Sequence, residues 1–255
     1  MINIQSSLHR YLTIFGILLI NTAAAQELPP IQTDRPDQTE CPFTVPKKYF
    51  QAEAGFSYEK INKKLSSVLL PTFLFKYGIS ERTELRLITE IEMQKYLTEK
   101  NTGLNPVTIG FKTNLVQERG IIPMISFIGH LTLPHVASSK NTSIYYAPAF
   151  RFTMQHTLSS KISLGYNLGA EWDGFTPEPA FIYTLTTGFS LTEKIGSFIE
   201  LYGFAPQQSE ADHRADAGIT FLLNNNMLFD IAGGIGLNSH AASYFIGAGF
   251  SFRVK

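Results

Sequence analysis

The sequence predicts an all-β fold, a transmembrane antiparallel up-and-down β-barrel of about 12 strands. Apolar and polar residues alternate in segment after segment from Tyr49 to Phe252. Short connections alternate with longer ones between these segments, and the longer connections are more polar. Charged residues are 16% of the chain, against about 25% in soluble domains, whereas 13% are aromatic. Strands with lipid on one face and water on the other have these properties.

Residues 1–25 have the features of a secretory signal peptide. His9 and Arg10 precede an apolar stretch over residues 11–20, and the alanines at 23–25 offer a cleavage site. The apolar stretch is about ten residues long, too short to span a bilayer as a helix. An uncleaved anchor helix is therefore the weaker alternative.

Residues 26–47 are rich in proline and charge. Prolines disfavour a helix here, and the charges disfavour a lipid-facing strand. We expect this segment to lie in the periplasm or to plug the mouth of the barrel, with a solvated leader as the alternative. Cys41 is the single cysteine, so the exported chain has no internal disulfide. The formal net charge is zero, which gives no reason to expect a nucleic-acid partner.

Residues 48–255 are expected to form the barrel. Alternation and turn chemistry divide them into strands at approximately 48–60, 66–79, 82–95, 105–117, 121–133, 144–157, 161–173, 179–191, 195–205, 214–223, 227–237 and 242–253. Short connections such as 118–120 alternate with longer ones such as 98–104 and 134–143, which places both termini on the periplasmic side. A soluble β-sandwich is the alternative, but it does not account for this alternation of connection lengths.

The two faces of the expected strands differ in polarity. In residues 82–95, Leu85 and Leu87 fall on one face, and Glu84 and Arg86 on the other. In a barrel the apolar face meets lipid and the charged face meets the lumen. The charged residues of the inward wall that we take as transport candidates are Glu53, Lys76, Glu84, Arg86, Glu90, Glu92, Lys112, Arg151, Glu171, Asp173 and Glu200. Glu59, Asp216 and Asp230 fall on the same wall.

Acids exceed bases on this wall, which indicates a polar passage with a mild preference for cations. The alternative is a lattice of salt bridges that fills a narrow barrel, because a barrel of about twelve strands lies between the filled eight-stranded case and the open porins.

One motif precedes the first strand. It consists of Thr33, Asp34, Arg35, Pro36, Asp37, Gln38, Thr39 and Glu40, and residues 44–47 and 50–53 follow it. With them it resembles the opening of the MetA-pathway phenol-degradation family of outer-membrane β-barrel, transporter-like proteins. The resemblance implies a transporter-like function, with hydrophobic or aromatic compounds as the substrate class.

The charges of this motif suggest how it would plug the barrel. The guanidinium of Arg35 can clamp a carboxylate with two hydrogen bonds. Its candidate partners are Glu53, Glu84, Glu90 and Glu92. The acids Asp34, Asp37 and Glu40 could in turn meet Lys76, Arg86, Lys112 or Arg151.

These features together predict a channel in the bacterial outer membrane that passes small molecules passively. Its expected partners are the outer-membrane bilayer, the barrel-assembly machinery and a small solute. We expect no catalytic, cofactor or metal site. Ser126 and His130 share one strand face, but four residues of strand separate them by about 13 Å, which is beyond hydrogen-bond reach. The alternatives are a closed structural or surface-interaction barrel and, third, a lipid-modifying or hydrolytic enzyme.

Overall fold

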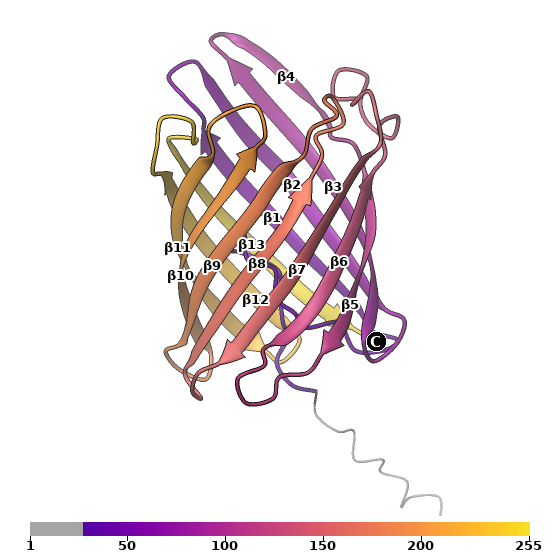
Figure 1. The fold of residues 1–255 in the computed structure, drawn as a ribbon, viewed down its shortest axis with the longest axis vertical. Helices are drawn as coiled ribbons and strands as arrows, with labels where there is room; N and C mark the ends of the chain where they lie inside the picture. Colours follow the sequence, from indigo (N-terminus) through magenta and orange to yellow (C-terminus); the bar gives the residue numbers. More distant parts are fainter. Residues whose placement is uncertain (1–27) are drawn as a thin grey trace, which may run out of the picture.

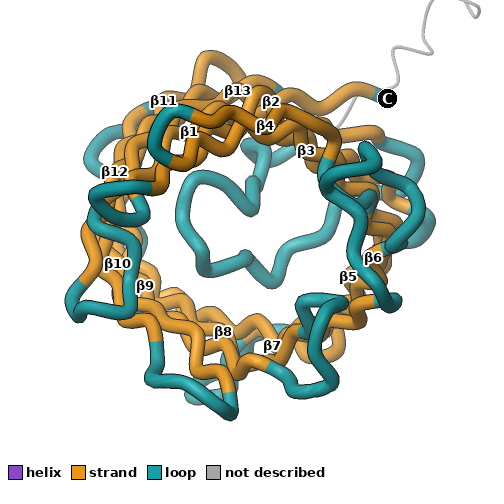
Figure 2. Tube along the Cα trace, turned by 90° about the horizontal axis from the view of Figure 1, so that it is seen from above, coloured by secondary structure: helices purple, strands orange, loops and turns teal. Residues whose placement is uncertain are grey.

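The computed structural model describes residues 28–255, which form one closed antiparallel barrel (Figures 1 and 2). The expected signal peptide lies outside the described residues. The strands are β1 (Phe50–Lys60), β2 (Leu65–Gly78), β3 (Thr83–Tyr96), β4 (Glu99–Leu104), β5 (Thr108–Val116), β6 (Met124–Thr132), β7 (Ala147–Thr157), β8 (Ile162–Glu171), β9 (Ala180–Ser190), β10 (Ile195–Pro206), β11 (Asp212–Asn224), β12 (Met227–Gly236) and β13 (Tyr244–Val254). Within residues 28–255, no helix is long and apolar enough to cross a membrane.

The barrel closes between its first and last strands. β1 pairs with β13 along its whole length, from Phe50 opposite Val254 to Lys60 opposite Tyr244. Each other strand pairs with its neighbours in the chain, except that β3 pairs with β2, β4 and β5. β4 pairs with the second half of β3, residues 91–96, and β5 pairs with the first half, residues 83–88. The thirteen strands therefore fill twelve positions in the ring. The predicted fold is confirmed.

The β4 position differs from the sequence prediction. Residues 98–104 were expected to be an outer loop, but Glu99–Leu104 is a strand that pairs with β3. The strand expected over 105–117 starts only at Thr108. Pro106 has no N–H to give to a ladder, so the pairing is interrupted there and resumes two residues later.

The strand faces follow the predicted polarity. On β3, Leu85 is 50% exposed and Leu87 is also exposed, whereas Glu84 and Arg86 are buried against the lumen contents. A transmembrane barrel requires this assignment, in which apolar side chains meet lipid and charged ones meet the interior. Near the end of β13, aromatic rings from neighbouring strands lie side by side on the outer face, where Phe50 stacks on Phe75 and is tilted against Phe252.

Residues 28–48, which we call the luminal segment, run inside the ring of strands. Figure 2 shows this segment as a loop in the centre of the barrel. It begins beside the β11–β12 turn, where Ile31 N–H donates to the carbonyl of Asn225 (2.8 Å). Near its other end, Lys47 forms a bridge with Gly78 at the end of β2. The described chain therefore fills part of its own barrel before it forms the wall.

Candidate functional site

Asp34 is the residue at which the luminal segment meets the most cations. Its carboxylate accepts hydrogen bonds from Lys112 (2.6 Å) and Lys76 (2.9 Å), and Arg86 Nη1 lies 3.3 Å away. Burial alone would raise the pKa of Asp34, but the charges of Lys112, Lys76 and Arg86 outweigh it and hold the pKa well below the usual 3.8. Asp34 is therefore ionised at neutral pH and anchors the segment.

The register of the wall explains why an acid is needed there. Lys76 on β2 lies directly opposite Arg86 on β3, and two like charges in such a pair repel each other. Lys112 on β5 lies opposite Glu84 on β3. The carboxylate of Asp34 lies between the three cations, so it offsets a repulsion that the wall has by itself.

Two wall carboxylates hold the backbone of the segment. Glu53 accepts hydrogen bonds from the N–H groups of Asp34 (3.0 Å) and Arg35 (3.1 Å). Glu84 accepts one from Val45 N–H (2.7 Å). Glu53 also forms an ion pair with Lys76 at 2.5 Å. Charge-assisted hydrogen bonds of this kind are about twice as strong as neutral ones, so both ends of the segment are tied to this side of the barrel.

Glu40 connects the segment to the opposite side. Its carboxylate lies 2.6 Å from Arg86 Nη2 and 3.9 Å from Arg151 Nη1. Its backbone exchanges two hydrogen bonds with the amide of Asn167 on β8, at 2.8 and 3.0 Å. Arg151 in turn lies 3.8 Å from Glu171 at the end of β8.

Glu200 on β10 also holds the segment. It accepts hydrogen bonds from Gln38 N–H (2.8 Å) and from the hydroxyl of Thr39, which also contacts the hydroxyl of Thr184 on β9. Nearby on β6, the hydroxyl of Ser126 donates to the carbonyl of Pro42 (2.5 Å). Five consecutive wall strands, β6 to β10, thus each contact the segment through a polar side chain.

Arg35 lies over two glycines. Gly55 on β1 and Gly249 on β13 are directly opposite each other. A Cβ atom on Gly55 would lie 2.0 Å from Arg35 Nη1, and one on Gly249 would lie 2.5 Å from Arg35 Nε. The guanidinium therefore fits only because both side chains are absent. Its Nη2 then reaches Asp230, the next residue across the sheet, at 3.0 Å.

The other motif residues lie around this point. Thr33 donates its hydroxyl hydrogen to the carbonyl of Arg35 (2.7 Å), and Pro36 lines a cavity in the lumen. Asp37 forms no ion pair with a cation in the described chain. Burial raises the pKa of Asp37 well above 3.8, and the nearby charges of Glu200 and Asp216 raise it further.

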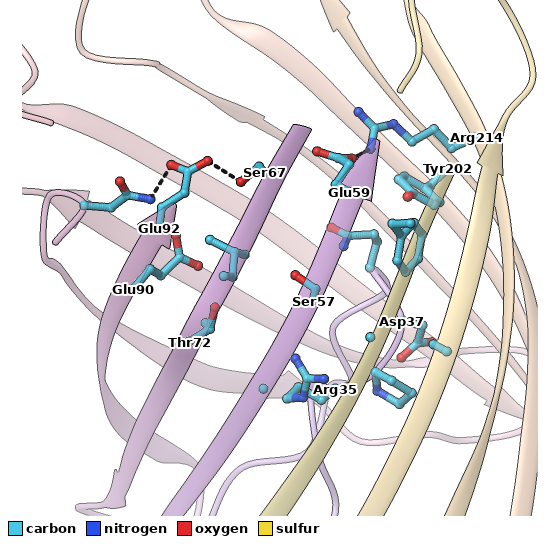
Figure 3. Close-up of a pocket in the computed structure, with 18 residues that line it drawn as sticks. Arg35, Asp37, Ser57, Glu59, Ser67, Thr72, Glu90, Glu92, Tyr202 and Arg214 are labelled. Carbon is cyan, nitrogen blue, oxygen red and sulfur yellow. Dashed lines mark hydrogen bonds and ion pairs between the residues drawn. The ribbon is translucent and has the colours of Figure 1, made fainter. Parts of the chain in front are cut away.

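Above the segment lies an outer cavity of about 470 Å³ (Figure 3). Glu90 and Glu92 lie on one side of it, and Arg214 and Tyr202 on the other (Figure 3). Glu92 accepts hydrogen bonds from Ser67 (2.5 Å) and Asn105 (3.1 Å), whereas Arg214 forms an ion pair with Glu59 (2.5 Å).

Asp173 is placed apart from this group. It follows the end of β8 in the outer connection, where its carboxylate accepts hydrogen bonds from the N–H groups of Phe175 (2.7 Å) and Thr176 (2.8 Å). The structure thus brings together Glu53, Lys76, Glu84, Arg86, Lys112, Arg151 and Glu200 around the segment, and places Glu90 and Glu92 in the outer cavity. Among residues 28–255, no group of His, Cys, Asp and Glu side chains is arranged to hold a metal ion.

Sequence reasoning did not anticipate the two lumen-facing glycines beneath Arg35 or the choice of Asp230 as its partner. A usable signal is present at Gly55, which interrupts an inward-facing row of β1 in which the other positions carry charged or polar side chains. Gly249 gives a weaker signal, because its own row on β13 also holds Phe245 and Gly247. Glycine in a strand interior often marks the close approach of another part of the chain.

Comparisons with known proteins agree with this fold. A family model described as "Putative MetA-pathway of phenol degradation" matches residues 33–254. The COG4313 outer membrane channel from Pseudomonas putida F1 has a similar fold, with a TM-score of 0.71 at 10% identity, over 88% of this chain and 100% of that one. The NanC porin is similar with a TM-score of 0.55 at 6% identity, over 80% of this chain and 100% of that one. A KdgM porin in complex with disordered oligogalacturonate gives a TM-score of 0.53 at 8% identity, over 79% and 98%. No curated protein matches the chain.

Proposed function

The chain belongs to the MetA-pathway phenol-degradation family, and from this premise we propose that it is an outer-membrane channel whose lumen is narrowed by the luminal segment. Small solutes pass through it passively, down their concentration gradient. The fold it shares with outer-membrane channels and porins supports this proposal. We expect insertion to require the barrel-assembly machinery, because the last strand presents aromatic residues such as Phe250 and Phe252 to lipid.

One observation carries the proposal. The lumen holds a cavity on each side of the luminal segment, about 470 Å³ on the outer side and about 240 Å³ on the inner side. Both cavities are lined by Arg35, Pro36 and Asp37, so a short piece of the segment separates them. The inner cavity is bordered by the small residues Gly165 and Gly188, which leave space beside the wall. A modest displacement of residues 35–37 would join the two cavities.

The family description favours small aromatic compounds as the solutes. The outer cavity offers aromatic rings from Tyr202 and Phe245 beside the carboxylates of Glu90 and Glu92. Aromatic rings stack at low cost, and carboxylates accept hydrogen bonds from phenolic hydroxyls. We propose phenol-like solutes on these grounds.

A closed structural or surface-interaction barrel is the second candidate. Ion pairs around Asp34 fill the lumen beside β2, β3 and β5, which favours a sealed interior. In addition, Ile144, Tyr145 and Tyr146 are more than 60% exposed in an outer connection, where a partner could bind.

Planar-bilayer conductance separates the two candidates. The refolded chain of residues 26–255 is compared with a chain that begins at Lys47, and heat-modifiable mobility shows that both barrels have folded. We expect conductance from both chains and a larger conductance from the shorter one. Equal conductance from the two would refute the narrowing role of the segment. Silence from both would refute the channel.

Liposome swelling tests the proposed solutes. Vesicles that contain the full protein are exposed to phenol, to catechol and to a pentose of similar size. Empty vesicles supply the control, because phenol crosses lipid unaided. Faster swelling with catechol than with the pentose, beyond the difference in empty vesicles, is expected. The reverse order would refute the aromatic preference.

A further inference from the structure

Residues 35–37 form the constriction between the two cavities, and we call them the strap. The strap is held on one side by Arg35, which lies over Gly55 and Gly249 and pairs with Asp230. Figure 3 shows Arg35 and Asp37 together at the base of the outer cavity. A solute that moves from the outer to the inner cavity must therefore pass along the strap.

The two sides of the strap differ in how well they are filled. Toward β2, β3 and β5, Asp34 is surrounded by Lys76, Arg86 and Lys112, whose side chains are at most 1% exposed. Toward β7 to β11, the inner cavity is bordered by short side chains such as Ser163, Thr186 and Ser197. Passage is therefore easier beside β10 and β11 than beside β2 and β3.

Three carboxyl groups face this easier side. Glu200 on β10 lies directly opposite Asp216 on β11, and both point into the lumen. Glu200 accepts a hydrogen bond from the N–H of Gln38, which places the preceding residue, Asp37, next to the pair. In the described chain, none of the three forms an ion pair with Lys, Arg or His.

Asp216 has an additional property that points to a ligand. It is 7% exposed, yet neither of its carboxylate oxygens accepts a hydrogen bond from an N–H or hydroxyl group within the described residues, and its hydrogen-bonding neighbour is the acidic side chain of Glu200. An unpaired buried carboxyl group is costly, because nothing replaces the water it has lost. The nearest cations already have carboxylate partners, since Arg214 pairs with Asp212 and Glu59, and Arg35 pairs with Asp230.

We propose that solutes and ions pass between the strap and the wall formed by β10 and β11, and that Asp37, Glu200 and Asp216 make this constriction selective for cations. The proposal rests on the channel function inferred above. The cations that fit are monovalent ions and small organic ammonium groups in transit, which supply the charge that the three carboxyl groups lack. A cation between them gains Coulomb energy at a place where water is partly excluded, whereas an anion is repelled.

The reversal potential of the full-length channel in a KCl gradient tests the proposal. One variant, Asp37→Asn, changes the strap and leaves every wall strand intact. A second, Glu200→Gln with Asp216→Asn, removes two carboxyl groups from the wall and keeps the shape of the side chains. The matched control is Glu81→Gln with Glu193→Gln, which removes two charges from exposed turns at the periplasmic end.

We expect the wild-type channel to favour potassium over chloride. Because burial raises the pKa of Asp37, the measurement is made at alkaline pH. There each ionised carboxylate removed should lower that permeability ratio by about threefold, which is the Coulomb effect of one charge close to a water-filled path. The control should keep the wild-type ratio. Variants with an unchanged ratio would overturn the constriction, while the channel itself would stand. A wild-type protein that folds but does not conduct would overturn the channel and the constriction together. Because Asp37→Asn lies outside the barrel wall, it gives a result even if the wall variant does not fold.

Discussion

Replacing Asp34 with asparagine should release the luminal segment from the barrel wall. Lys112 has a fully buried side chain, and Asp34 is its carboxylate partner in the lumen. In Asp34→Asn, the ammonium of Lys112 loses its negatively charged partner and keeps only neutral acceptors, namely the new amide oxygen and the carbonyls of Cys41 (2.8 Å) and Phe43 (3.4 Å). Removal of one partner from a buried ion pair costs about 3–5 kcal/mol. A loss of about 3 kcal/mol raises the undocked fraction of the segment about 100-fold.

Reaction of the Cys41 thiol with a maleimide can detect undocking of the segment without an introduced cysteine, because Cys41 is the single cysteine of the chain. Burial raises the pKa of the docked Cys41 thiol to about 12, and the positive charge of Lys112 offsets only part of that effect. At about pH 8 the docked thiol is thiolate at a fraction of about 10⁻⁴, whereas a free thiol with a pKa of about 8.5 is about one-quarter thiolate. The docked segment should therefore react about 10³-fold more slowly with a maleimide than the undocked one.

The assay compares a small maleimide with one attached to a long polyethylene glycol chain. Asp34 itself helps to raise the pKa of Cys41, so the small reagent would react faster in the variant even with the segment docked. The bulky reagent cannot enter a filled lumen and reports only undocking. Asp173→Asn, a change in an outer connection, is the control and should label like the wild type. If the bulky reagent labels Asp34→Asn no faster than the wild type, Asp34 does not anchor the segment.

Three further results are expected. Gly249→Ala puts a Cβ atom within 2.5 Å of Arg35 Nε, so it should displace Arg35 from Asp230 and raise the channel conductance. The control, Ala248→Gly on the outer face, should leave the conductance as it is. Unchanged conductance in Gly249→Ala would show that the position of the strap does not depend on this fit. Asp216→Asn should raise the temperature at which the folded barrel loses its heat-modifiable mobility by a few degrees, because it removes a buried carboxyl group that has no donor, and a lower temperature would contradict this reasoning. Docking of the segment should also depend on pH, and bulky-maleimide labelling, corrected for thiol ionisation, measures it. Asp34 has a lowered pKa, so its contribution to docking is present above pH 3.8 and is lost below it, whereas Asp37 has a raised pKa, so its contribution is full below pH 3.8 and is lost as the pH rises. Asp37→Asn should therefore remove the loss of docking at high pH and leave the loss at low pH.

Much of the fold could be predicted from the sequence, because a barrel repeats one simple rule in every strand. The alternation in Glu84, Leu85, Arg86 and Leu87 is sufficient to assign the inner and outer faces of β3. The prediction failed at β4. β4 and β5 both pair with β3, one after the other, and the sequence prediction did not recognise that the chain around Pro106 only interrupts this pairing. A proline limits which backbone groups can form hydrogen bonds, but it does not reveal whether the residues before it pair with the same neighbouring strand as the residues after it.

The contacts of the luminal segment were harder to foresee. That acids of the motif could meet basic residues of the wall follows from charge alone. Which acid meets which base depends on how far the segment enters the lumen and on the stagger of the strands. Arg35 and Asp230 are separated by 195 residues, and only the closure of β13 on β1 brings them together. The unpaired state of Asp37 likewise follows from position, not from its neighbours in the sequence.

The interruption at residues 105–107 gives the barrel a seam at its outer rim. β4 pairs with β3 on one edge, whereas its other edge is joined to the connection over 134–143 by a few bonds, including Leu104 N–H to Ser138 Oγ (2.8 Å) and Asn101 to Asn141 (3.0 Å). Figure 1 shows β4 rising beside this connection at the outer end. Two strands in a continuous ladder are held together by many backbone hydrogen bonds, whereas this edge of β4 is held by a few hydrogen bonds that mostly involve side chains. We therefore expect the outer rim beside β4 to open locally at a lower free-energy cost than the continuous ring of strands below it.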